Sequence, residues 1–284
     1  GNTVLQFWDK PESNRVVVVD TKASDGAKLR TLELPGQSLP EHMAYHHEQQ
    51  ELAVKLVGYR DREIIILDLA DRELSVKRRL KTPFTPHAIA MSADGQDLLV
   101  FSVDLALHRY DWQSLLAKAN QQLKTQRTIM LLNMTRAPES DTFFLSSFGP
   151  MLTAFDATTG RQISNDVGFA GGDIIHISSK SMVAQTDLLN HRLHLADSIS
   201  LALLNRFDVP YAPRAIAVDE AHERLFVGDW FGGVVHTYTL GTLEPAGEPI
   251  PVGPYLRKFA FDPLDNVLYP RLLYTSPSPR DSVV

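Results

Sequence analysis

The feature that most constrains this chain is a repeat with a period of roughly 41 to 48 residues. Segments beginning at Pro86, Pro213 and Lys258 superimpose, and each reads as a short alternating strand, a turn-forming cluster and a second apolar run. The central residue of the first strand recurs at intervals of 41 to 46 residues, at Ala44, Ala90, Asn133, His176, Ala217 and Ala260. A fixed period of this length signals stacked supersecondary units.

A second series of residues keeps the same phase. The residue that ends a later strand of each repeat recurs as Asp20, Asp68, Asp111, Asp156, Asp197 and Thr239. Aspartates at strand ends can accept backbone N–H bonds and close the following turn. Four short antiparallel strands fit in each period, which is the blade of a β-propeller. Residues 112–124 depart from this pattern, because Leu115, Ala119 and Leu123 fall at i, i+4 and i+8 and predict a short helix.

With these repeats the chain resembles the YVTN-type β-propeller family, a relative of the WD-repeat and NHL-repeat propellers. The resemblance is carried by Pro-x-x-Ile-Ala at Pro86 and Pro213, by the Ser92-Ala-Asp-Gly95 turn and by Phe155-Asp-Ala-Thr-Thr-Gly160. It spans about residues 3–270, although the YVTN tetrapeptide does not occur and residues 129–210 lack the Asp-Gly turn. The resemblance implies an extracytoplasmic bacterial protein, periplasmic or secreted.

The strand count predicts an all-β propeller with four-stranded antiparallel blades in one domain, residues 1–270. Residues 3–35 supply three strands, five full blades follow, and residues 255–269 supply two more strands. A seven-bladed, incomplete ring is expected; in the six-bladed alternative the final strand completes the N-terminal three. Residues 271–284 are expected to be a non-native tail on a fragment, because LLYTSPSPRD at 272–281 resembles a translated sequencing-library adapter.

Composition narrows the classes of partner. The absence of cysteine excludes disulfides, thiolate nucleophiles and cysteine metal sites. A net charge of −6 with scattered basic residues gives no electrostatic footprint for nucleic acid. No apolar run approaches the roughly 18 residues that a membrane span needs. A monomer without cofactor or metal is expected.

No linear motif nominates an enzyme. The Gly-x-Ser-x-Gly elbow and the phosphate-binding glycine motifs do not occur. His47-Glu-Gln-Gln-Glu51 falls one residue short of a zinc signature and is interpreted as a hairpin turn. His42, His46 and His47 are interpreted as solvated turn histidines, since a strand would set His42 and His46 roughly 13 Å apart. A second group is predicted to pack between blades: His108, His194 and His236.

One recurring set of residues is a candidate ligand site. Three positions before each first-strand residue stand Glu41, His87, Met130, Asp173, Arg214 and Arg257. The first strand of a blade starts near the central channel, so these side chains can meet at its mouth. The like charges of Arg214 and Arg257 need a counter-charge, either from Glu41 or Asp173 or from an anionic ligand. The candidate site is Glu41, His87, Asp173, Arg214 and Arg257; the alternative is a hydrated, self-neutralising rim.

Two functions fit this sequence. The first is a non-enzymatic binding or scaffold protein that holds a protein partner or a small anionic ligand at one face or at the channel mouth. The alternative is an enzyme similar to propeller lactonases or quinoprotein dehydrogenases. Three convergent carboxylate or imidazole groups would favour the enzyme, and an exposed aromatic cluster would favour a partner surface. Trp230 and Phe231 are candidates for such a cluster, with packing between blades as the alternative.

Overall fold

The computed structural model describes residues 2–8, 14–20, 28–34, 39–57, 62–70, 73–124, 131–138, 140–147 and 149–272. It divides into two compact units, residues 1–123 and 124–284, which are described separately. The described residues form antiparallel strands and one short 3-10 turn, without an α-helix. The all-β class expected from the repeat is therefore confirmed.

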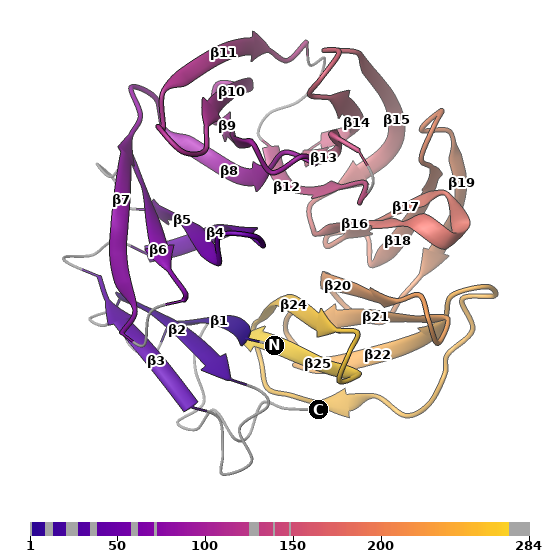
Figure 1. Cartoon of the computed structure of the whole chain (residues 1–284). Coiled ribbons are helices and arrows are strands. Elements are labelled where there is room, and N and C mark those ends of the chain that lie inside the picture. The colour runs from indigo at the N-terminus through magenta and orange to yellow at the C-terminus, as the bar shows by residue number, and fades with distance from the viewer. Residues whose placement is uncertain are drawn as a thin grey trace. The chain divides into compact units, whose positions relative to one another are not determined.

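The first unit contains three antiparallel sheets whose strands lie in chain order (Figure 1). The first sheet is β1 (Asn2–Trp8), β2 (Asn14–Asp20) and β3 (Lys28–Glu33). The second is β4 (Leu39–His46), β5 (Glu51–Val57), β6 (Glu63–Asp68) and β7 (Ser75–Lys81). The third is β8 (Pro86–Met91), β9 (Asp97–Ser102), β10 (Ala106–Asp111) and β11 (Ala117–Gln122).

The second unit repeats this arrangement. Its first sheet is β12 (Leu131–Arg136), β13 (Thr142–Ser147), β14 (Gly149–Asp156) and β15 (Gln162–Ala170). The next is β16 (Ile174–Ile177), the 3-10 turn η1 (Ser178–Lys180), β17 (Met182–Asp187), β18 (Arg192–Asp197) and β19 (Leu203–Asp208). The third is β20 (Pro213–Asp219), β21 (Arg224–Asp229), β22 (Val234–Thr239) and β23 (Ile250–Pro251). The last is the pair β24 (Leu256–Asp262) and β25 (Val267–Leu272).

The core of each unit lies between consecutive sheets. In β6, alternate side chains point to opposite faces, so Ile65 packs with Leu34 beside the first sheet, while Ile64 packs with Leu98 of the third. Both isoleucines are completely buried. An inner strand of such a stack is covered on both faces, which explains why β6 reads as an unbroken apolar run rather than as an alternation.

Aspartates at strand ends close the turns that follow them. The Asp68 carboxylate accepts the Ala70 N–H at 3.0 Å, and Asp197 accepts the Ser200 N–H at 2.7 Å. At Asp111 the N–H and hydroxyl of Ser114 hold the pKa of the carboxyl well below its ordinary value of 3.8. The structural role predicted for these residues is confirmed where their side chains are described.

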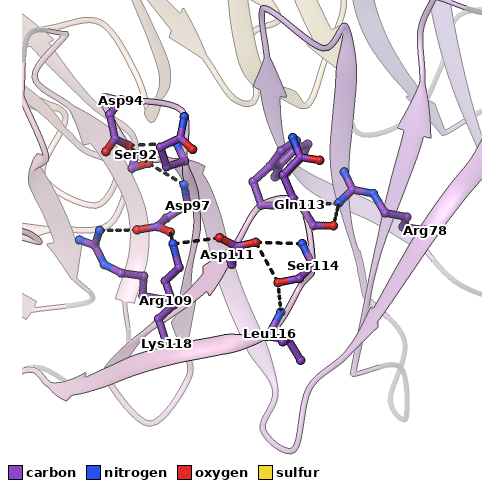
Figure 2. Close-up of polar contacts among 12 residues, drawn as sticks. Arg78, Ser92, Asp94, Asp97, Arg109, Asp111, Gln113, Ser114, Leu116 and Lys118 are labelled. Carbon is purple, nitrogen blue, oxygen red and sulfur yellow. Dashed lines mark hydrogen bonds and ion pairs between the residues drawn. The ribbon is translucent and has the colours of Figure 1, made fainter.

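The short helix predicted over residues 112–124 is wrong, because residues 117–122 form β11 and pair with β10. Ion pairs hold this outer strand (Figure 2): Lys118 contacts Asp97 at 2.6 Å and Asp111 at 3.0 Å. The i, i+4, i+8 spacing of apolar residues that suggested a helix had another cause. Leu115 lies in the turn before the strand with φ 56°, and Leu123 is buried after it.

The first-strand residues do occupy the first strands of separate sheets. Four of them face a partner the same number of positions further along the chain: Ala44 with Ala53, Ala90 with Leu99, Ala217 with Phe226, and Ala260 with Tyr269. In β12 the equivalent pair is Thr135 with Phe144, so the assignment of Asn133 was wrong by two residues. A polar threonine stands where four other repeats have alanine, which hid the register. In β16 the equivalent pair is Ile175 with Ala184, so the assignment of His176 was wrong by one residue.

The boundary expected at residue 270 falls inside β25, where Arg271 and Leu272 still pair with Lys258 and Leu256. The remaining residues of the expected tail, 273–284, lie outside the described residues, as does Met130. The single domain over residues 1–270 stays a prediction.

Replacing Ala217 by leucine is expected to lower the free energy of unfolding by about 1 to 3 kcal/mol, because Ala217 is 4% exposed within an apolar cluster and extra methylenes overpack it. The control is Ala260→Leu at the equivalent position of the next repeat, where the alanine is exposed. That change should stay within about 0.5 kcal/mol in urea denaturation. Equal effects of the two substitutions would contradict the assigned positions.

Candidate binding surface

Five of the first strands carry a β-bulge near their start. The register shifts lie between Pro40 and His42, Pro86 and Ala88, Leu131 and Asn133, Pro213 and Ala215, and Leu256 and Lys258. A bulge sets two residues opposite one and re-aims the side chains there. The residues at the bulges are Glu41, His87, Leu132, Arg214 and Arg257, so four members of the predicted ligand site share one backbone feature. Leu132 takes the place predicted for Met130.

The second unit brings three of the predicted site residues together. Asp173 directly precedes β16, and its N–H donates to the Arg214 carbonyl of the next sheet at 3.1 Å. Its buried carboxylate accepts the Lys258 Nζ at 2.6 Å. Asp173 is thus ion-paired with Lys258, which was not among the predicted site residues. Strict strand alternation would set Lys258 and Arg257 on opposite faces, so sequence reasoning missed Lys258; the bulge between Leu256 and Lys258 breaks that alternation.

Arg214 holds an unusual position for a guanidinium. It lies over the Trp230 ring, 5.1 Å from its centroid, and donates one long hydrogen bond, 3.4 Å, to the Gly171 carbonyl. Burial lowers its pKa from the ordinary value of an arginine side chain, and the positive charge of Arg257 lowers it further, while the negative charge of Asp173 acts in the opposite direction. The positive charge of the Arg214 guanidinium is therefore partly desolvated and lies near a second cation, Arg257.

In the first unit, the other predicted site residues have separate neighbours. The ring centroids of His87 and His42 lie 6.1 Å apart. The backbone carbonyl of His87 accepts a hydrogen bond from the Lys55 Nζ at 2.9 Å. Only the backbone of Glu41 is described. A single site shared by all five residues stays a prediction.

Two of the remaining histidines pack against aromatic side chains. His46 is 6% exposed and its ring lies 5.2 Å from that of Trp112, so the prediction of a solvated turn histidine is wrong for His46. The His108 ring stacks on the Phe84 ring with their centroids 3.6 Å apart, which agrees with a packing role. Within the described residues no three His, Asp or Glu side chains are placed to hold a metal ion.

The second unit carries an aromatic surface formed by His191, Tyr211, Trp230, Phe231 and Tyr255. Each ring contacts the next in a chain. The centroids are 5.2 Å apart for His191 and Tyr211, 6.2 Å for Tyr211 and Phe231, 6.5 Å for Phe231 and Trp230, and 6.0 Å for Trp230 and Tyr255. Three of these side chains remain accessible, with Tyr211 at 61%, Phe231 at 57% and Tyr255 at 38% exposed. Such a contiguous exposed aromatic cluster is typical of an interaction site.

Backbone hydrogen bonds fix the loops that carry the aromatic surface. The Ala212 N–H donates to the His191 Nδ1 at 2.7 Å, the Trp230 N–H to the Ala212 carbonyl at 3.0 Å, and the Tyr255 N–H to the Trp230 carbonyl at 2.6 Å. Tyr211 and Tyr255 have φ of 30° and 64°, a region that side chains larger than glycine rarely adopt. Neighbouring loops thus hold these rings at a conformational cost, which is characteristic of functional surfaces.

Comparison with known proteins identifies the fold. The sequence matches no known protein family and no curated protein. A chain from a solved structure described as the crystal structure of the mitotic checkpoint complex is similar, with a TM-score of 0.77 over 95% of this chain and 81% of that chain, at 11% identity. At that identity the likeness shows the fold alone: a β-propeller with four-stranded antiparallel blades. Among the described residues there is no helix long and apolar enough to cross a membrane.

Proposed function

We propose that this propeller is a non-enzymatic binding protein that holds a protein partner on its aromatic surface. The observation that carries the proposal is the chain of five aromatic rings, whose outer members remain exposed although backbone hydrogen bonds fix their loops. Tyrosine and tryptophan are enriched among the residues that dominate binding energy, because their rings offer large contact area at low entropic cost. The similar chain was itself solved within a complex, which supports a partner-holding role.

Three finer proposals accompany this one. The Pro-x-x-Ile-Ala strand starts support assignment to the YVTN-type repeat, and an extracytoplasmic location rests on that resemblance. The bulge residues support a second binding role, for a small anion beside Arg214, because its guanidinium has a single long hydrogen bond. Replacing Arg214 and Arg257 by methionine should abolish any citrate binding measured by calorimetry; unchanged binding would remove this second role.

Selection from a phage-displayed library of random dodecapeptides tests the main proposal. The wild-type chain should enrich a shared peptide motif, and the double variant Tyr211→Ser/Phe231→Ser should lose it, because both rings are removed from the surface. The matched control is Ile199→Ser/Leu264→Ser, which removes two apolar residues that are 78% and 81% exposed elsewhere in the same unit. The control should keep the motif. A wild-type selection without enrichment, or an equal loss in the control, would overturn the proposal.

A further inference from the structure

The aromatic surface borders a guanidinium without an ion pair in the described part of the chain, and the carboxylate whose charge acts on it, Asp173, is itself paired with Lys258. Arg214 lies against the Trp230 ring, and within the described residues no carboxylate comes within ion-pair distance of it. Other cations of the second unit do have such a partner: Lys258 pairs with Asp173 at 2.6 Å and Arg192 with Asp208 at 3.0 Å. A guanidinium has five N–H donors, so most of those of Arg214 remain available to a ligand.

Two carboxylates in the loops of this surface are already used by the fold. Asp229, 5% exposed, accepts the N–H groups of Phe231 and Gly232 at 2.9 and 2.8 Å. Asp187, 1% exposed, accepts the N–H groups of Leu189 and Asn190. Each therefore faces the backbone of its own turn. The unsatisfied charge of the surface is positive, so charge complementarity favours an acidic occupant.

The spacing of the rings matches an extended chain. A strand rises about 3.3 Å per residue, so alternate side chains on one side lie about 6.6 Å apart. Neighbouring rings from Tyr211 through Phe231 to Trp230 have centroids 6.2 and 6.5 Å apart. Consecutive same-side residues of an extended segment can therefore each meet one ring before the next reaches Arg214.

We infer that the partner contributes an extended acidic peptide segment, with apolar side chains on Tyr211 and Phe231 and an Asp or Glu carboxylate bound by the Arg214 guanidinium. This inference rests on the proposed function. Arginine suits the role because its planar fork binds a carboxylate through two parallel hydrogen bonds. A single small anion would leave the rings uncovered.

The same peptide library separates this inference from the proposed function. Peptides selected by the wild-type chain should be enriched in Asp or Glu two positions from an apolar residue. The Arg214→Met variant should select apolar peptides without that acidic enrichment. The matched control, Arg192→Met, removes one equal charge from an exposed ion pair and should keep the acidic preference.

Each outcome has a separate meaning. No enrichment with the wild-type chain overturns the proposed function and the inference together. Enrichment of apolar peptides without acidic residues, or an acidic preference that survives Arg214→Met, overturns the inference and leaves the proposed function standing. Loss of all binding in Arg214→Met with a lowered melting midpoint reflects misfolding, and the decision then passes to the titration with the wild-type protein.

Calorimetric titration of the wild-type chain with one selected peptide and its Asp→Asn or Glu→Gln form gives the second readout. The neutral form should bind at least about tenfold more weakly, and the difference should shrink at high salt. In Arg214→Met the two peptides should bind alike, because the carboxylate has lost its partner. Equal affinity of both peptides for the wild-type chain, or tighter binding of an oligothymidylate that depends on Arg214, would overturn the inference.

Discussion

Replacing Trp112 by alanine is expected to lower the free energy of unfolding by about 3 to 5 kcal/mol. The side chain is 1% exposed and donates its indole N–H to the Gln49 Oε1 at 2.9 Å. Arg78 lies over its ring, 5.1 Å from the ring centroid, and donates to the carbonyl of Trp112. Arg78 also donates to the carbonyl of Gln113 (Figure 2). One substitution therefore leaves a cavity between two sheets and removes a cation–π contact.

Urea denaturation of the purified chain measures the effect of Trp112→Ala. Leu116→Ala is the control, because Leu116 lies four residues further on and is 69% exposed. Its cost should stay within about 0.5 kcal/mol. A Trp112→Ala chain that unfolds at the wild-type urea concentration would contradict the placement of this side chain between the sheets.

Mild acid should destabilise the folded chain well above the range in which its carboxyl groups titrate. Burial is the main cause that lowers the pKa of four histidines from the ordinary 6.5: His108, His176, His194 and His236. Below about pH 6.5 these histidines become protonated in the unfolded chain, while the folded chain keeps them neutral. The unfolded state then binds more protons, so stability falls as the pH is lowered. Each such histidine adds a slope of at most about 1.4 kcal/mol per pH unit.

Unfolding measured in urea between pH 7.5 and 5.5 isolates this effect, since the ordinary pKa values of Asp and Glu are 3.8 and 4.5. His194→Leu should flatten the dependence, because the His194 ring is 3% exposed and its Nδ1 has no hydrogen bond within the described residues. Replacing the exposed His47 by leucine should leave the dependence as it is in the wild-type chain. Stability that does not change from pH 7.5 to 5.5 would show that these rings are solvated.

The repeat period predicted the blades well because its cause is local: each hairpin needs turn residues and apolar strands at fixed spacing. Ala44, Ala90, Ala217 and Ala260 were placed in register for that reason. The error at Asn133 arose where Thr135 replaced the small apolar residue. The predicted helix over residues 112–124 failed because residues 117–122 pair along the backbone with β10, and this pairing brings Lys118 to Asp97, which lies 21 residues away in sequence.

The candidate site was predictable only in part. Arg214 and its neighbour Arg257 follow from the repeat phase, and Trp230 and Phe231 from their loop. Lys258 was missed because a bulge changes how side chains alternate between the two faces of the strand, and no sequence pattern predicted that bulge. His191, Tyr211 and Tyr255 were missed because they come from three other loops. Their meeting depends on how successive sheets are stacked, and the repeat period alone does not determine that.

At the bulge residues, the backbone and the side chain have different roles. Two of their carbonyls bind the neighbouring sheet: the His87 carbonyl accepts a hydrogen bond from the Lys55 Nζ and the Arg214 carbonyl accepts one from the Asp173 N–H. The attachment between sheets thus uses atoms that every amino acid possesses. Charged, imidazole and aliphatic residues can succeed one another at these positions without loosening the stack. A propeller built in this way can acquire new specificities by point mutation at the bulges, one repeat at a time, while its architecture stays unchanged.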